Sequence, residues 1–153
     1  MNDLKRFLEA QENDFERALA EIKRGRKQSH WMWYIFPQIA GLGFSETSRF
    51  YAVKDRTEAE LYLAHPVLGA RLVEISEALL EIEGKTANQI FGNPDDVKLK
   101  SSMTLFGALK NTNPIFQSVL DKYFNGTNDL RTLQLIDDES YAVGVIFAET
   151  RTK

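Results

Sequence analysis

The feature that most constrains this fold is a row of apolar residues between Pro66 and Gly84. The row advances by four, three, four and three positions, which is the spacing of one face of an α-helix. Glutamates take the other faces, Pro66 suits the first helical position, and Gly84 suits the end of the helix. The pattern predicts a helix whose apolar face lies in the core. That face consists of Leu68, Leu72, Ile75, Leu79 and Ile82.

Signals of further helices occur along most of the chain. A second row at helical spacing, followed by a glycine, predicts a helix over about 14–24. Polar capping residues and Asn-Pro pairs mark the starts of three more. We therefore predict an all-α fold, with a single compact domain of several helices over residues 1–136. The three starts are Thr86-Ala87-Asn88-Gln89, Asn93-Pro94 and Asn113-Pro114.

The composition is that of one globular domain. The chain has 153 residues, of which 43% are hydrophobic and 27% charged, so it can bury a core of ordinary size. Its net charge of −3 makes general nucleic-acid binding unfavourable, because such binding needs a broad basic face. There is no cysteine, which excludes disulfides and thiolate chemistry.

The two ends differ in character from the middle of the chain. Residues 1–9 are charged and lack the apolar core of a secretory signal, and no apolar run is long enough to span a bilayer. We therefore expect a cytoplasmic protein with no membrane association. Residues 137–153 form a C-terminal extension in which Tyr141 to Phe147 are strand-like. This extension is predicted to be either a strand-like addition or poorly ordered.

An aromatic segment between Lys27 and Gln38 is the most informative stretch for function. It contains both tryptophans of the chain, Trp31 and Trp33, together with His30. Large aromatic side chains most often anchor a core. The same rings can also form a pocket wall that stacks on a planar ligand, with His30 and Gln38 supplying hydrogen bonds. The sequence leaves both interpretations open.

A second candidate group lies on the helix that begins near Pro94. Lys98, Ser101 and Ser102 are three and four positions apart, so they are predicted to share one helical face. One lysine and two hydroxyls suit a phosphate or a carboxylate, although a solvated face with hydroxyls bonded to the preceding turn is the more common explanation. No metal site is predicted, because the two histidines are 35 positions apart and neither pairs with a glutamate at helical spacing.

With these segments in view, the chain resembles domain-of-unknown-function family 1810. The resemblance runs from Arg6-Phe7 to about Ile136 and implies an α-helical fold without an established activity. A weaker similarity in the order of segments links the chain to YbiA-like domains, which implies chemistry on ADP-ribose and related N-glycosides. The motifs that carry the first resemblance are Gly25-Arg26-Lys27, Ser29-His30-Trp31-Met32-Trp33, Phe36-Pro37-Gln38, Tyr62-Leu63-Ala64-His65-Pro66-Val67-Leu68-Gly69 and Lys98-Leu99-Lys100-Ser101-Ser102-Met103-Thr104-Leu105-Phe106.

Two functional hypotheses follow from the sequence. The first is a small-ligand-binding protein or enzyme that acts on a nucleotide or ADP-ribose derivative and needs no cofactor. Trp31 or Trp33 would stack on the ring, and His30 would share one cleft with Lys98 or Ser102. In the enzymatic form, His30 and Glu58 are the candidate acid–base residues. The alternative is a non-catalytic interaction module that binds a protein through its aromatic segment, and the oligomeric state is left open.

Overall fold

The computed structural model describes residues 4–137, which form helices joined by turns and loops, with no strand among them. A final helix covers 130–137, where the described part of the chain ends. The predicted all-α fold is therefore confirmed. The preceding helices are α1 (Lys5–Glu12), α2 (Phe15–Lys23), α3 (Met32–Ile35), α4 (Glu46–Tyr51), α5 (Arg56–Ala64), α6 (Leu68–Glu81), α7 (Ala87–Phe91), α8 (Asp95–Gly107) and α9 (Ile115–Phe124).

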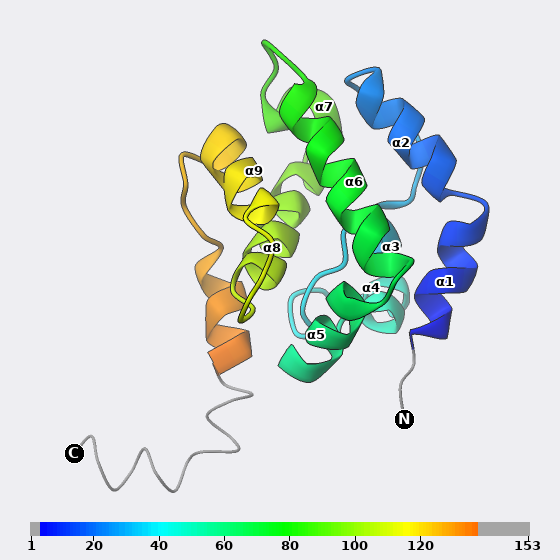
Figure 1. Cartoon of the computed structure of the whole chain (residues 1–153), viewed down its shortest axis with the longest axis vertical. Coiled ribbons are helices and arrows are strands. Elements are labelled where there is room, and N and C mark those ends of the chain that lie inside the picture. Colours follow the sequence, from blue (N-terminus) through cyan, green and yellow to red (C-terminus); the bar gives the residue numbers. More distant parts are fainter. Residues whose placement is uncertain (1–3, 138–153) are drawn as a thin grey trace, which may run out of the picture.

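Helix α6 occupies the middle of the molecule. It packs against α2, α5 and α9, and α9 in turn packs against α8 (Figure 1). The predicted apolar face is confirmed, since Leu68, Leu72, Ile75 and Leu79 are all buried. The helix begins at Leu68 rather than at Pro66. The Nδ1 atom of His65 accepts hydrogen bonds from the backbone N–H groups of Val67 and Leu68, which caps this start.

Local sequence signals explain several of the shorter elements. Thr86 and Gln89 form the predicted capping box at the start of α7, with reciprocal side-chain-to-backbone hydrogen bonds. Gly92 ends that helix with a φ of +75°, a backbone conformation that glycine adopts without strain. Within the aromatic segment only the single turn of α3 is helical, and the chain from Gln38 to Phe44 is a loop, as predicted.

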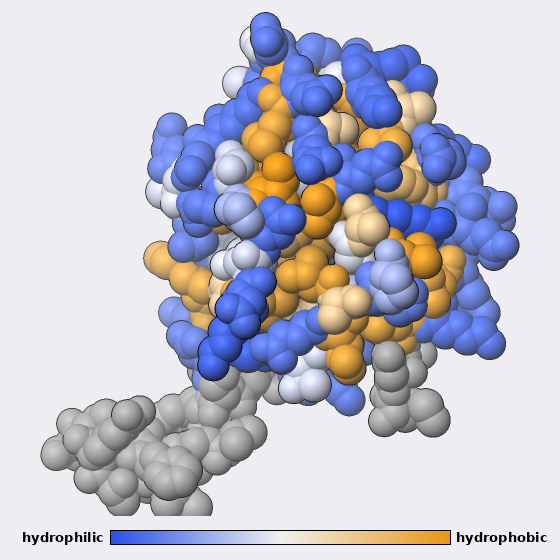
Figure 2. Space-filling model, in the orientation of Figure 1, coloured by the Kyte–Doolittle hydropathy of each residue, from blue (hydrophilic) through white to orange (hydrophobic). Residues whose placement is uncertain are grey.

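On the face shown in Figure 2, hydrophilic residues lie mainly around the edge and apolar areas lie across the middle. Among residues 4–137, no helix combines the length and the apolar character that crossing a membrane requires. The strand-like character predicted for Tyr141 to Phe147 concerns residues outside the described range.

Candidate functional site

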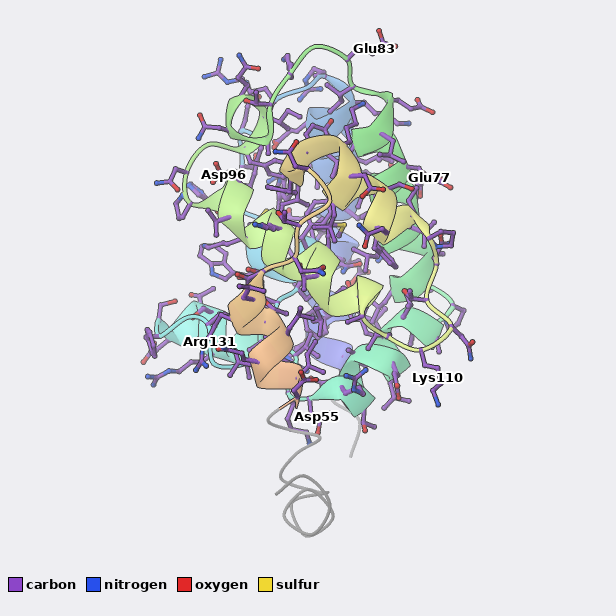
Figure 3. The ribbon with its side chains drawn as sticks, turned by 90° about the vertical axis from the view of Figure 1, so that its left-hand side faces the viewer. Asp55, Glu77, Glu83, Asp96, Lys110 and Arg131 are labelled. Atoms are coloured by element: carbon purple, nitrogen blue, oxygen red, sulfur yellow. The ribbon has the colours of Figure 1, made fainter. Side chains whose placement is uncertain are left out.

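A groove of about 400 Å3 lies between the loop before α4 and the first half of α8. Its wall includes Trp33, Gln38, Phe44, Lys98, Ser101 and Asp129. A smaller hollow of about 110 Å3 adjoins it, shares Trp33 and Gln38, and adds Arg49. In Figure 3, helix 130–137 lies below α8, with α4 beside it near the labelled Arg131. The groove therefore joins segments that are almost one hundred positions apart.

Trp33 and Lys98 are the central pair of this groove. The Nζ atom of Lys98 lies 4.7 Å from the centre of a Trp33 ring, within the range of a cation–π interaction. Asp95, in the first turn of α8, lies 3.6 Å from the same nitrogen and 2.8 Å from Nζ of Lys27. Lys98 is partly exposed at the groove, whereas the Lys27 side chain is buried against Trp31. Of these two lysines, Lys98 is therefore the one that can contact a ligand in the groove.

Ser101 continues the polar row along α8, and Asp129 meets it from the start of helix 130–137. Ser101 lies one helical turn after Lys98, and its hydroxyl lies 3.0 Å from Oδ2 of Asp129. The same carboxylate oxygen accepts hydrogen bonds from the backbone N–H and the hydroxyl of Thr132, so Asp129 caps helix 130–137. The backbone N–H of Asp129 donates to the Thr104 hydroxyl at 2.9 Å. The position of Asp129 is thus fixed from both sides.

A buried carboxylate fixes the backbone that leads into Trp33. Glu21 on α2 accepts hydrogen bonds from the backbone N–H groups of Gln28 and Ser29, from the Ser29 hydroxyl and from the Trp31 indole. Burial alone would raise the pKa of Glu21, but these hydrogen bonds outweigh it and lower the pKa from 4.5 to about 2. Trp31 is fully buried, so it belongs to the core and only Trp33 reaches the groove.

The loop that carries Gln38 is also held in place. Ile39 and Val53 form an isolated parallel bridge, in which the Val53 N–H donates to the Gln38 carbonyl and the Ala40 N–H donates to the Val53 carbonyl. Among residues 4–137, no hydrogen bond engages the side-chain amide of Gln38. Its donors and its acceptor therefore remain available where the groove and the smaller hollow meet.

The structure separates several of the predicted site residues from this groove. His30 is exposed and does not line the groove, so the expected meeting of His30 with Lys98 does not occur there. Ser102 is fully buried on another face of α8 from Ser101, and among the described residues its hydroxyl has no hydrogen-bond partner. Successive residues on a helix point about 100° apart, which explains why only Ser101 faces the groove.

Glu58 lies in a buried ion pair. Its carboxylate accepts two hydrogen bonds from the Arg6 guanidinium, at 3.1 and 3.2 Å, and a third from the backbone N–H of Lys54. Arg6 also donates to the carbonyls of Phe50 and Ala52, so the pair ties α1 to the α4–α5 connection. These contacts give Glu58 a structural role, and we leave it out of the proposed site.

Asp129 and Phe44 in the groove, and Arg49 in the adjoining hollow, are residues that the sequence did not single out. Phe44 is 77% exposed, which is unusual for so large an apolar side chain. Asp129 was recognisable only as a helix cap, because nothing in the sequence places it beside Ser101. Within residues 4–137, no cluster of three or more His, Asp or Glu side chains suits a metal ion.

Comparison with known proteins places the chain in a family. A family model described as "Protein of unknown function (DUF1810)" matches residues 1–136. The chain belongs to this family. A crystal structure of the conserved hypothetical protein Rv1873 from Mycobacterium tuberculosis is also similar, with 43% sequence identity and a TM-score of 0.87. The match covers 89% of this chain and 97% of the other.

These comparisons confirm the family resemblance and carry no activity with them. No curated protein matches the chain. The weaker similarity to YbiA-like domains gains no support. The family model ends at residue 136, so residues from 137 onward lie outside the match.

Proposed function

We propose that this protein binds a small ligand in the groove between the 38–45 loop and α8. The ligand carries an anionic group that meets Lys98 and a planar or apolar part that lies against Trp33 and Phe44. Nucleotide derivatives are the class that best combines these features. We propose binding alone, which needs no acid–base group in the groove.

The observation that carries this proposal is the pairing of Lys98 with Trp33 in an open groove. A volume of about 400 Å3 falls within the range of small-molecule sites. One indole, one ammonium group, one free amide, one carboxylate and three serine hydroxyls line it, and the neighbouring Arg49 adds a second positive charge. Small-molecule sites typically consist of apolar walls with a few polar groups that orient the ligand.

The alternative of an interaction module is less well supported by the aromatic segment itself. Trp31 and Phe36 are completely buried, and Met32 and Ile35 are nearly so. A partner protein would need these rings at the surface, since binding energy at an interface comes mainly from aromatic anchors that a partner covers. Within the segment, Trp33 faces the groove rather than a flat surface.

The proposal is tested with two matched lysine variants. Lys98→Met removes the charge but keeps an unbranched side chain over Trp33. Lys100→Met makes the same change two positions later, where the ammonium group lies 6.0 Å from the Phe124 ring and outside the groove. Titration calorimetry with AMP and ADP-ribose should show roughly tenfold weaker binding for Lys98→Met, the loss expected for one charge-assisted contact.

The control variant decides how this result is interpreted. Lys100→Met should bind AMP within about twofold of the wild type, because its charge lies outside the groove. Equal losses for the two variants would show that only the overall charge matters, and the groove would not be the site. A wild-type protein that binds neither nucleotide at millimolar concentration would refute the proposed ligand class.

A further inference from the structure

The Asp129 carboxylate is engaged at only one of its two oxygens. Oδ2 receives all three hydrogen bonds, from the Ser101 hydroxyl and from the N–H and hydroxyl of Thr132. Among residues 4–137, no hydrogen bond and no ion pair involves Oδ1. Asp129 is only partly buried and lines the groove. One strong acceptor is therefore left for a ligand, on a side chain that the rest of the fold holds still.

The position of this acceptor relative to Lys98 defines a ligand chemistry. Ser101 follows Lys98 by one helical turn, about 5 Å along the axis, and Ser101 touches Asp129. The acceptor and the cation therefore line the same groove, with Ser101 between them and Trp33 beside the cation. A ligand that contacts Lys98, Asp129 and Trp33 together needs an anionic group, a hydrogen-bond donor and a ring at three separate positions.

We infer that Asp129 determines specificity by accepting a hydrogen bond from a ligand hydroxyl, and that the ligand is a ribose-bearing anion. This inference rests on the proposed function and narrows its ligand class. In a nucleoside monophosphate the base, the phosphate and the ribose hydroxyls leave the sugar at three different positions. These groups match Trp33, Lys98 and Asp129 in kind. A hydroxyl lost from such a ligand leaves the carboxylate oxygen without that partner, which gives discrimination.

Asp129→Asn is a suitable test because it changes only the open oxygen. Asparagine caps a helix about as well as aspartate does, so its carbonyl oxygen can take the three donors that Oδ2 now accepts. Its NH2 group then occupies the position of Oδ1 and presents a donor to a ligand hydroxyl instead of a charged acceptor. Thermal melts should show a Tm close to that of the wild type, which confirms that the cap survives.

The decisive experiment measures the affinities of wild type and Asp129→Asn for AMP, 2′-deoxy-AMP and 3′-deoxy-AMP by calorimetry. AMP should bind the variant about tenfold more weakly than the wild type. For the deoxy analogue that lacks the contacting hydroxyl, the affinities of the two proteins should agree within about twofold. The other analogue should bind the variant about tenfold more weakly than the wild type, as AMP does. Each deoxy analogue therefore serves as the control for the other. Combining the two proteins with AMP and a deoxy analogue gives a double-mutant cycle that isolates the contact between Asp129 and one hydroxyl.

Three outcomes would overturn the inference, and they separate it from the proposed function. Equal affinity of wild type and variant for AMP would show that Asp129 does not touch the ligand, although the groove would remain the site. Equal losses for AMP and both deoxy analogues would show that the charge of Asp129 matters and the hydroxyls do not. No binding of any of the three compounds to the wild type would overturn the proposed function as well.

Discussion

Neutralising Glu21 tests the account of how the aromatic segment is held. Glu21→Gln keeps the shape of the side chain and removes its charge. The amide oxygen can still accept from the Gln28 and Ser29 N–H groups and from the Trp31 indole. What is lost is the charge that strengthens those hydrogen bonds, together with the acceptor now used by the Ser29 hydroxyl.

The magnitude follows from the pKa of Glu21. A fall from 4.5 to about 2 corresponds to an upper limit of about 3–4 kcal/mol, at roughly 1.4 kcal/mol per pH unit. Solvent screening at the edge of the cluster reduces this contribution to roughly 1–3 kcal/mol. We expect Glu21→Gln to lower the free energy of unfolding by that amount at pH 7.

The pH dependence of this difference has a definite sign. The pKa is lower in the folded protein, so the ionised carboxylate contributes its full stabilisation above pH 4.5 and loses it as the pH falls toward 2. The gap between wild type and Glu21→Gln should therefore narrow by about 1 kcal/mol between pH 6 and pH 3.5.

Urea melts of both proteins at several pH values measure the gap directly. Glu77→Gln is the matched control, because Glu77 is exposed on α6 and points outward (Figure 3). That variant should stay within about 0.5 kcal/mol of the wild type at pH 7. The reasoning would be refuted if Glu21→Gln were equally stable at pH 7, or if its deficit did not change with pH.

Two further predictions concern the interior and use the same urea melts. A methyl group at Gly69 would lie 2.0 Å from the backbone carbonyl oxygen of Leu63, so Gly69→Ala should destabilise by at least about 1–3 kcal/mol; an unchanged melt would show that α5 and α6 do not approach this closely. Ser102→Ala removes a buried hydroxyl that has no partner among the described residues, so it should be neutral or stabilising by up to about 1 kcal/mol. A clear loss of stability there would mean that the hydroxyl has a partner after all.

The helices were predictable because their signals are local. The apolar row of α6, the capping box at Thr86 and the Asn-Pro starts each depend on residues within a few positions of one another. Such patterns report directly on hydrogen bonding and burial within one element. The boundary of α6 was less certain, because the His65 side chain rather than the proline supplies the cap.

The groove was only partly predictable, because it depends on how distant segments meet. The sequence pointed to Trp33, Gln38, Lys98 and Ser101 through residue type and spacing, and the structure brings these four together. The sequence also grouped Trp31 with Trp33. The two residues are only two positions apart, yet Trp31 lies in the core and Trp33 lines the groove. Asp129 enters only through the path of the chain after α9, which no local pattern reveals.

The chain has two tryptophans, and they provide the most direct measurement of the central claim. Their indole N–H groups give two separate signals in a 15N-correlated NMR spectrum. The Trp31 signal comes from a buried ring hydrogen-bonded to Glu21, and the Trp33 signal comes from the groove. During a titration with AMP, the account predicts a saturable shift of the Trp33 signal while the Trp31 signal stays in place. A Trp33 signal that remains unmoved at millimolar AMP would contradict it.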